Sequence, residues 1–139
     1  MARIVVGVDG SPAAAAALRW ALDEAGLRRA TLEVVHTWVF PAIDELPGGA
    51  VDQLVSDLQR CATDVLDHVV DGIAGANPDV EVVRRVLEGS PGRVLTEIAA
   101  GADLLVVGSR GRGGFAGLLL GSVAQQCVHH ARCPVVVVR

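Results

Sequence analysis

Four residues in the last third of the chain are spaced in a way that suits phosphate binding. Gly108, Gly111, Gly121 and Ser122 follow the pattern G-x2-G-x9-G-S. Glycine leaves no side chain between backbone N–H groups and a ligand, and it tolerates the positive φ that tight loops need. Ser122 is expected to cap a helix over residues 122–132, whose N-terminus carries a partial positive charge of about half a unit. The pattern therefore predicts an anion site.

Arg110 and Arg112 add two cations to the same loop. The alternative interpretation is a surface loop that is closed by an ordinary capped helix, because short glycine motifs also occur by chance. The glycines alone do not decide between these two interpretations.

Two better-known nucleotide motifs are excluded. Residues Gly111 to Ala116 match the dinucleotide fingerprint G-x-G-x-x-A, but that fingerprint needs an acidic residue about 20 positions further on to bind the ribose. The chain has no Asp or Glu after Asp103. A Walker phosphate loop needs a lysine, and all 12 basic residues of this chain are arginine.

A metal site is a weaker hypothesis. Cys127 and His130 are three residues apart on the same face of the expected helix, and Cys133 follows shortly after it. The spacing matches no common zinc motif, and Cys133 precedes a proline at the start of a strand. We favour a partly buried helix with a surface histidine.

Three further polar residues lie among apolar ones near the start of the chain. His36, within an apolar strand, is interpreted as a core residue with a hydrogen-bond partner rather than as a catalyst. Ser11 is interpreted as a helix cap, because no G-x-S-x-G elbow surrounds a serine. Asp9 could act as a general base, but its neighbours in the motif include no second carboxylate and no obvious nucleophile.

Composition excludes several classes of function. The chain has 139 residues and a net charge of −4, with few aromatic residues and no basic face, so nucleic acid is not an expected partner. No apolar run approaches the 18 residues typical of a membrane span, and no signal peptide is recognised, so we expect a cytoplasmic protein. The three cysteines follow no disulfide framework, which indicates reduced thiols. We expect one domain over residues 1–139.

Apolar runs rich in β-branched residues alternate with helical patterns along the chain. This alternation predicts an α/β fold with a parallel sheet that is covered by helices on both faces. Ser11 and Pro12 suit the N-cap and the first position of the first helix. The expected strands are 3–9, 31–37, 79–86, 102–108 and 134–138, the expected helices are 11–29, 51–73, 90–101 and 122–132, and 38–50 is expected to be a loop.

Asp9 is the last residue of the expected first strand, and the glycine loop begins at the carboxyl end of the expected fourth strand. Ligands of open parallel sheets bind beyond the carboxyl ends of the strands, where the strand order reverses. If the first and fourth strands are neighbours, Asp9 and the glycine loop face one crevice.

The chain also resembles a known family. The segment "GSRG" followed by nine residues and "GS", together with "IVVGVDGS", "VVHTW", "VLEGSPGRVLTEIA" and "CPVVVV", resembles the universal stress protein family in its ATP-binding class. The resemblance extends over essentially the whole chain. It implies a five-stranded, doubly wound, Rossmann-like parallel sheet in the order 3-2-1-4-5, with ATP, and with it Mg²⁺, bound between the first and fourth strands.

The resemblance also assigns roles to residues. Asp9, beside Val8, is placed against the adenosine, Thr37 at the adenine through a backbone contact, and Val107 and Gly108 at the ribose. The phosphates are placed against Gly111, Gly121, Ser122 and Val123. Arg110 and Arg112 are added as candidate phosphate contacts because of their charge and position.

We expect binding rather than catalysis, because phosphoryl transfer needs a placed base and several charge stabilisers around the γ-phosphate. The expectation is a nucleotide-responsive regulator in stress adaptation with little or no hydrolysis. Two alternatives remain: a slow ATP hydrolase or transferase that uses Asp9, and a nucleotide-free dimeric interaction module. The apolar strand 134–138 would be exposed at a sheet edge, and, as the resemblance also implies, we expect it to pair two copies into a homodimer.

Overall fold

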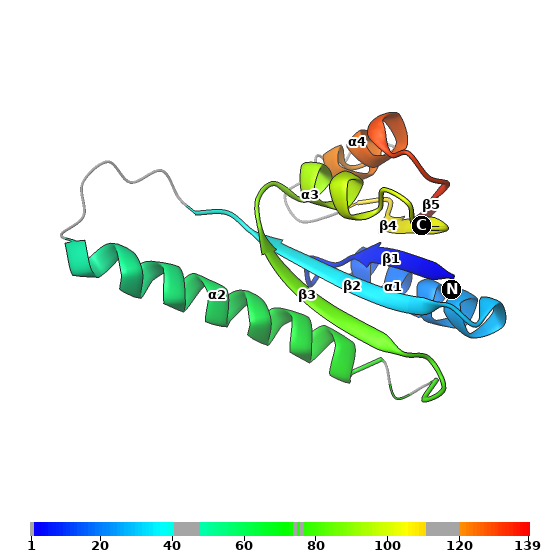
Figure 1. Ribbon diagram of the computed structural model, residues 1–139, viewed down its shortest axis with the longest axis horizontal. Coiled ribbons are helices and arrows are strands. Elements are labelled where there is room, and N and C mark those ends of the chain that lie inside the picture. The colour runs from blue at the N-terminus through cyan, green and yellow to red at the C-terminus, as the bar shows by residue number, and fades with distance from the viewer. Residues whose placement is uncertain (1, 41–47, 74, 76, 111–119) are drawn as a thin grey trace.

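The computed structural model describes residues 2–40, 48–73, 75, 77–110 and 120–139. Helices and strands alternate, and the strands form one parallel sheet in the order β3-β2-β1-β4-β5 (Figure 1). The predicted fold class and strand order are therefore confirmed. The elements are β1 Arg3–Gly7, α1 Pro12–Arg28, β2 Thr31–Trp38, α2 Gly48–Asp71, β3 Val82–Glu88, α3 Pro91–Ile98, β4 Leu104–Gly108, α4 Ser122–His130 and β5 Val135–Val138.

The central strand β1 is apolar because side chains on both of its faces are buried. Ile4 and Val6 point to one face and Val5 to the other, and all three are fully buried. Ile4 pairs with Leu32 on β2 and with Leu104 on β4, so the most apolar part of each strand lies at the same level of the sheet.

The helices form two layers. Helices α1 and α2 cover the face that carries Ile4 and Val6, and α3 and α4 cover the face that carries Val5 and Leu105. Figure 1 shows α3 and α4 side by side near β4, and the long α2 running along β3. In the described part of the chain, no helix is long and apolar enough to cross a membrane.

Helix α1 starts as the sequence predicts. Ser11 has extended backbone angles (φ −76°, ψ 159°), its Oγ accepts a hydrogen bond from the N–H of Ala14 at 3.2 Å, and Pro12 begins the helix. The helix ends at Arg29, whose φ of 54° lies in the left-handed region that commonly stops a helix.

Several boundaries differ from those predicted. The third strand begins at Val82 rather than at 79, because Asn77 to Val80 turn instead, with the Val80 N–H bonded to the Asn77 carbonyl at 3.3 Å. Trp38, predicted to be in a loop, belongs to β2 because it pairs with Glu88. Helix α2 starts at Gly48 rather than at 51. The rest of the predicted loop, residues 41–47, lies outside the described residues.

Candidate functional site

The sheet order makes β1 and β4 neighbours, so their carboxyl ends lie side by side. Val6 pairs with Val106 near these ends. Val8 and Asp9 follow β1, and Val107 and Gly108 end β4. Four of the predicted site residues are therefore brought to the same edge of the sheet, at the point where the strand order reverses.

Asp9 lies in a tight turn between β1 and α1. Its Oδ1 accepts a hydrogen bond from the N–H of Ser11 at 2.9 Å, and Gly10 between them has a φ of 82°. Only glycine adopts this angle readily. The turn keeps the carboxylate of Asp9 beside the N-terminus of α1.

The backbone at Gly108 is closely packed against α1. A Cβ atom at position 108 would lie 2.9 Å from both the carbonyl carbon and the carbonyl oxygen of Ala13. The first turn of α1 can therefore approach the end of β4 only because residue 108 is a glycine. This packing explains Gly108 whether or not a ligand binds.

The described ends of the glycine loop are held together by hydrogen bonds. The N–H of Ser109 bonds to the carbonyl of Val138 at 2.8 Å, and the N–H of Gly121 bonds to the carbonyl of Ser109 at 2.6 Å. The start of α4 is thereby fixed beside the end of β4. Arg110 is exposed at this end, whereas Gly111 and Arg112 lie outside the described residues.

The cap of α4 differs from the prediction. Gly121, with extended angles (φ −67°, ψ 165°), is the N-cap, and Ser122 is already the first helical residue. The bond from Gly121 to Ser109 keeps Gly121 outside the helix. Among the described residues, no hydrogen bond reaches the N–H groups of Ser122, Val123 or Ala124. These three donors begin a helix that no side chain caps.

Thr37 is half-buried on β2, next to the end of β1, and pairs with Leu87 on β3. Its neighbour His36 was predicted to be a core residue with a partner. His36 does have a partner, because its Nδ1 lies 2.8 Å from the carbonyl oxygen of Val8, but it is half-buried rather than buried. It therefore contacts the residue that precedes Asp9.

The cysteines and histidines near the C-terminus do not form a metal cluster. No group of three or more metal-ligating side chains is found within the described ranges. Cys127 is buried, and burial raises the pKa of its thiol to about 11, with Cys133 adding to the shift. Burial also raises the pKa of Cys133. Both thiols are protonated at neutral pH, which makes them poor metal ligands and nucleophiles.

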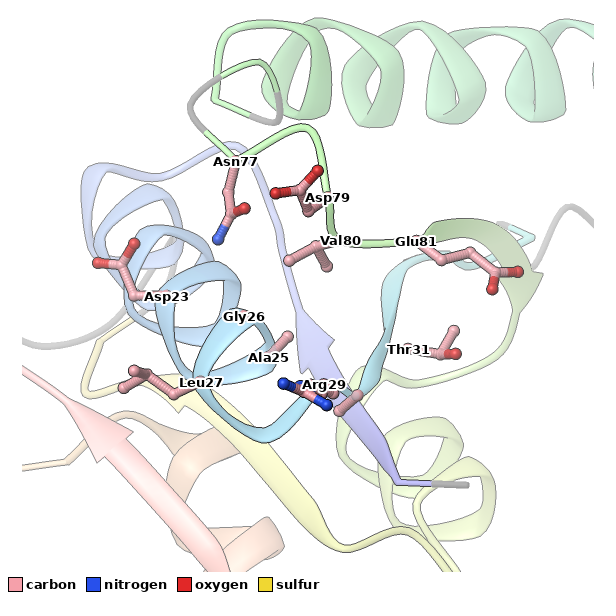
Figure 2. A pocket seen from close by; sticks show the side chains of 11 residues that line it. Asp23, Ala25, Gly26, Leu27, Arg29, Thr31, Asn77, Asp79, Val80 and Glu81 are labelled. Carbon is pink, nitrogen blue, oxygen red and sulfur yellow. The ribbon is translucent and has the colours of Figure 1, made fainter.

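A cavity of about 670 Å³ lies elsewhere, at the amino ends of the strands (Figure 2). Figure 2 shows it between the end of α1 and the connection from α2 to β3. Three carboxylates line it, those of Asp23, Asp79 and Glu81, against the single guanidinium of Arg29. This excess of negative charge disfavours phosphate ligands, so the cavity is not an alternative nucleotide site.

The fold and the crevice define a class of protein. A parallel sheet whose strand order reverses beside an uncapped helix N-terminus is an arrangement that α/β proteins use to bind phosphate-containing ligands. The sequence matches the profile of the universal stress protein family over residues 1–139. The chain belongs to the universal stress protein family.

Individual relatives agree with this assignment. The universal stress protein Rv2005c of Mycobacterium tuberculosis (strain ATCC 25618 / H37Rv) is 44% identical over 138 residues, which cover 99% of this chain and 45% of the relative. This chain thus spans less than half the length of that relative.

Two solved structures combine a similar fold with a bound nucleotide. A universal stress protein in complex with cAMP is 27% identical, with a TM-score of 0.77 over 99% of this chain and 97% of the other. The universal stress protein from Archaeoglobus fulgidus in complex with dAMP is 25% identical, with a TM-score of 0.70 over 100% of this chain and 98% of the other.

Proposed function

We propose that this chain binds ATP, together with Mg²⁺, at the carboxyl ends of β1 and β4, and that it acts as a dimeric, nucleotide-responsive regulator in stress adaptation. Adenosine would lie against Val8, Asp9 and Thr37, and the ribose against Val107 and Gly108. The triphosphate would follow the glycine loop to the start of α4, where the proposed contacts are Arg110, Gly111, Arg112, Gly121, Ser122 and Val123.

One observation carries this proposal. The hydrogen bond from Gly121 to Ser109 holds the uncapped start of α4 beside the end of β4, one strand from Asp9. The N–H groups of Ser122, Val123 and Ala124 are the kind of donors that phosphate oxygens accept from, and the helix dipole adds a favourable potential.

The relatives support an adenine nucleotide as the ligand. The two nucleotides in the solved relatives, cAMP and dAMP, share adenine and each carry a single phosphate. We propose a triphosphate here because the pattern G-x2-G-x9-G-S is complete in this sequence and resembles the ATP-binding class of the family.

The residues near the loop fit a magnesium ion that is bound mainly through the phosphates and has few protein ligands. Mg²⁺ prefers oxygen ligands and is commonly bound through substrate phosphates with few protein ligands. Ser122 offers an exposed hydroxyl at the start of α4. No carboxylate follows Asp103, so the glycine loop itself contributes none.

We expect little or no hydrolysis for the same reason. A water-activating carboxylate would have to come from outside the glycine loop and α4. Asp9 is the one acidic residue among the proposed contacts, but its Oδ1 accepts a hydrogen bond from Ser11 and lies at the adenosine end of the proposed ligand. The alternative, an Asp9-dependent hydrolase, requires steady turnover that is lost in Asp9→Asn while binding is retained.

A valine at position 121 tests the site. In Gly121→Val a branched side chain is placed where the phosphates approach the start of α4, so we expect ATP binding, measured by isothermal titration calorimetry, to be lost. Gly49→Val is the matched control, because a side chain at Gly49 meets nothing within 4 Å. We expect it to bind ATP like the wild type.

Thermal unfolding of both variants separates a lost site from a lost fold. Unchanged ATP affinity in a folded Gly121→Val protein would remove the phosphate site from the start of α4. Failure of the wild type to bind ATP would refute the proposal as a whole and leave the nucleotide-free interaction module.

A further inference from the structure

The hydrogen-bond ladder between β1 and β2 stops in an unusual way at its carboxyl end. In a parallel pair, alternate residues of one strand direct both N–H and C=O toward the same neighbour. On β2 these are the odd-numbered residues, since Thr31 donates to Ala2 at 3.0 Å and the carbonyl of Val35 accepts from Val8 at 2.9 Å. The next bond of the ladder would run from the N–H of Thr37 to the carbonyl of Val8.

The side chain of His36 occupies that acceptor instead. Its Nδ1 lies 2.8 Å from the carbonyl oxygen of Val8. Because a carbonyl oxygen only accepts hydrogen bonds, Nδ1 carries the proton. The β1–β2 pairing ends at Gly7 and Val35, although β2 continues to pair with β3 as far as Trp38 and Glu88.

The hydrogen bond from His36 to Val8 leaves the backbone of Thr37 outside the β1–β2 ladder. Within the part of the chain that the structure describes, neither its N–H nor its C=O makes a hydrogen bond. Both groups point to the β1 side of β2, beyond the last β1–β2 pair, which is the crevice proposed for the nucleotide. Backbone groups that are not paired within the protein bond to water or to a ligand, because leaving them unpaired away from water costs free energy.

On the purine edge that carries N7, an adjacent donor and acceptor suit adenine better than guanine. Adenine presents a ring nitrogen acceptor next to its N6 amino donor, whereas the corresponding N7 and O6 of guanine are both acceptors. At this edge a backbone N–H and C=O from one residue satisfy the adenine pattern, whereas the C=O would face an acceptor of guanine, which must turn its N1–H toward the strand instead.

We propose that His36 is a positioning residue that sets the selectivity for adenine. By donating to the carbonyl of Val8, it keeps Thr37 out of the β1–β2 ladder, so that the N–H and C=O of Thr37 remain open to the base. This inference rests on the proposed nucleotide function, which assigns the adenine to Thr37, and adds the side chain that prepares that contact.

Two substitutions of nearly equal size test the role of the donor. His36→Asn places an amide N–H at the branch position of Nδ1, so it can still donate to Val8. His36→Leu has a similar shape without a donor. His36→Phe, which keeps a ring without the donor, serves in its place if the leucine variant does not fold.

The first measurement is amide hydrogen exchange at Thr37 in the nucleotide-free protein, followed by NMR. We expect fast exchange in the wild type and in His36→Asn. In His36→Leu we expect exchange to slow by about tenfold or more, because the N–H of Thr37 can now bond to Val8. A protected Thr37 amide in the wild type, or equal exchange in the wild type and His36→Leu, would overturn the inference.

The second measurement compares ATP with GTP by calorimetry. Loss of one hydrogen bond predicts that His36→Leu binds ATP about tenfold more weakly. GTP binding should not change, and His36→Asn should match the wild type. A uniform loss for both nucleotides would indicate a merely structural role and reject the selectivity. Should the wild type bind neither nucleotide, the proposed function fails and the selectivity with it, while the exchange result still reports what His36 does to Thr37.

Discussion

At the scale of single residues, Gly108 shows how packing and ligand binding can require the same amino acid. The sequence pattern suggests a ribose contact for this glycine. In the structure its missing side chain also makes room for the backbone of Ala13. A substitution at this position therefore reports on the contact between α1 and the sheet before it reports on any ligand.

We expect Gly108→Ala to be destabilised by about 1–3 kcal/mol, because overpacking against backbone atoms forces α1 to shift. Urea unfolding monitored by circular dichroism measures the change. Gly49→Ala is the matched control, since its new methyl group meets nothing within 4 Å. It should gain up to about 1 kcal/mol, because alanine favours a helix more than glycine does. Equal stability of Gly108→Ala and the wild type would contradict the close approach.

The buried thiol of Cys127 makes stability depend on alkaline pH. In the folded chain its pKa is raised by burial to about 11, against an ordinary value of 9.0 for a thiol in water. Between these two values the unfolded chain releases the proton and the folded chain keeps it. The unfolded state then binds fewer protons, so the free energy of unfolding falls as the pH rises. The slope approaches about 1.4 kcal/mol per pH unit.

This slope can be measured cleanly in this protein. The chain contains no lysine and no tyrosine, so cysteines are the only side chains that titrate between pH 9 and 11. We expect the free energy of unfolding, measured with urea, to fall much less steeply with rising pH in Cys127→Ala. The slope that remains would come mainly from Cys133. Cys61→Ala, which changes an exposed thiol, should keep the wild-type slope. An unchanged slope in Cys127→Ala would show that this thiol is not shielded from water.

At the scale of elements, the identity of each helix and strand was predictable and several ends were not. The apolar, β-branched runs of β1 and β4 are typical of strands that are buried on both faces. The predicted start of β3 was too early because residues 79–82 alternate between polar and apolar types as a strand does, whereas the hydrogen bond that forms the turn at Asn77 leaves no trace in that periodicity.

For the candidate site, the sequence indicated the location but not the details of the hydrogen bonding. The spacing of the glycines pointed to the ends of β4 and α4, and the structure brings those ends together. The cap of α4 was misplaced by one residue, because a serine is a better cap than a glycine by propensity alone. The hydrogen bond from Gly121 to Ser109 is a long-range contact, and it makes Gly121 rather than Ser122 the N-cap of α4. The hydrogen bond from His36 to Val8 could not be predicted from the sequence either, since it depends on where β1 ends.

At the scale of the whole molecule, charge is distributed unevenly along the chain. All 16 acidic residues occur at or before Asp103, although the net charge is −4. Arg110 lies two residues after the end of β4, and Arg139 directly follows β5. The charged groups that line the cavity at the opposite end of the sheet are three carboxylates and one guanidinium. An anionic ligand is therefore favoured near the ends of β4 and β5 over the cavity at the amino ends of the strands.

The last strand bears on the proposed assembly. β5 is at the edge of the sheet, and its four valines are all half-buried. Such an apolar edge is normally covered, and pairing with the same strand of a second copy would cover it symmetrically. This apolar edge supports the proposed homodimer through residues 134–138.

A proline at position 137 tests this dimer without breaking the sheet. The carbonyls of Pro134 and Val138 accept bonds from β4, so the even-numbered residues of β5 face β4 and Val137 directs its N–H outward. Proline is tolerated at edge positions whose N–H faces away from the sheet. We expect Val137→Pro to be a folded monomer by sedimentation velocity, under conditions in which the wild type is a dimer. Val136→Pro, which removes an inward N–H, should lose stability instead. A dimeric Val137→Pro protein would place the interface elsewhere, and a monomeric wild type would refute the dimer.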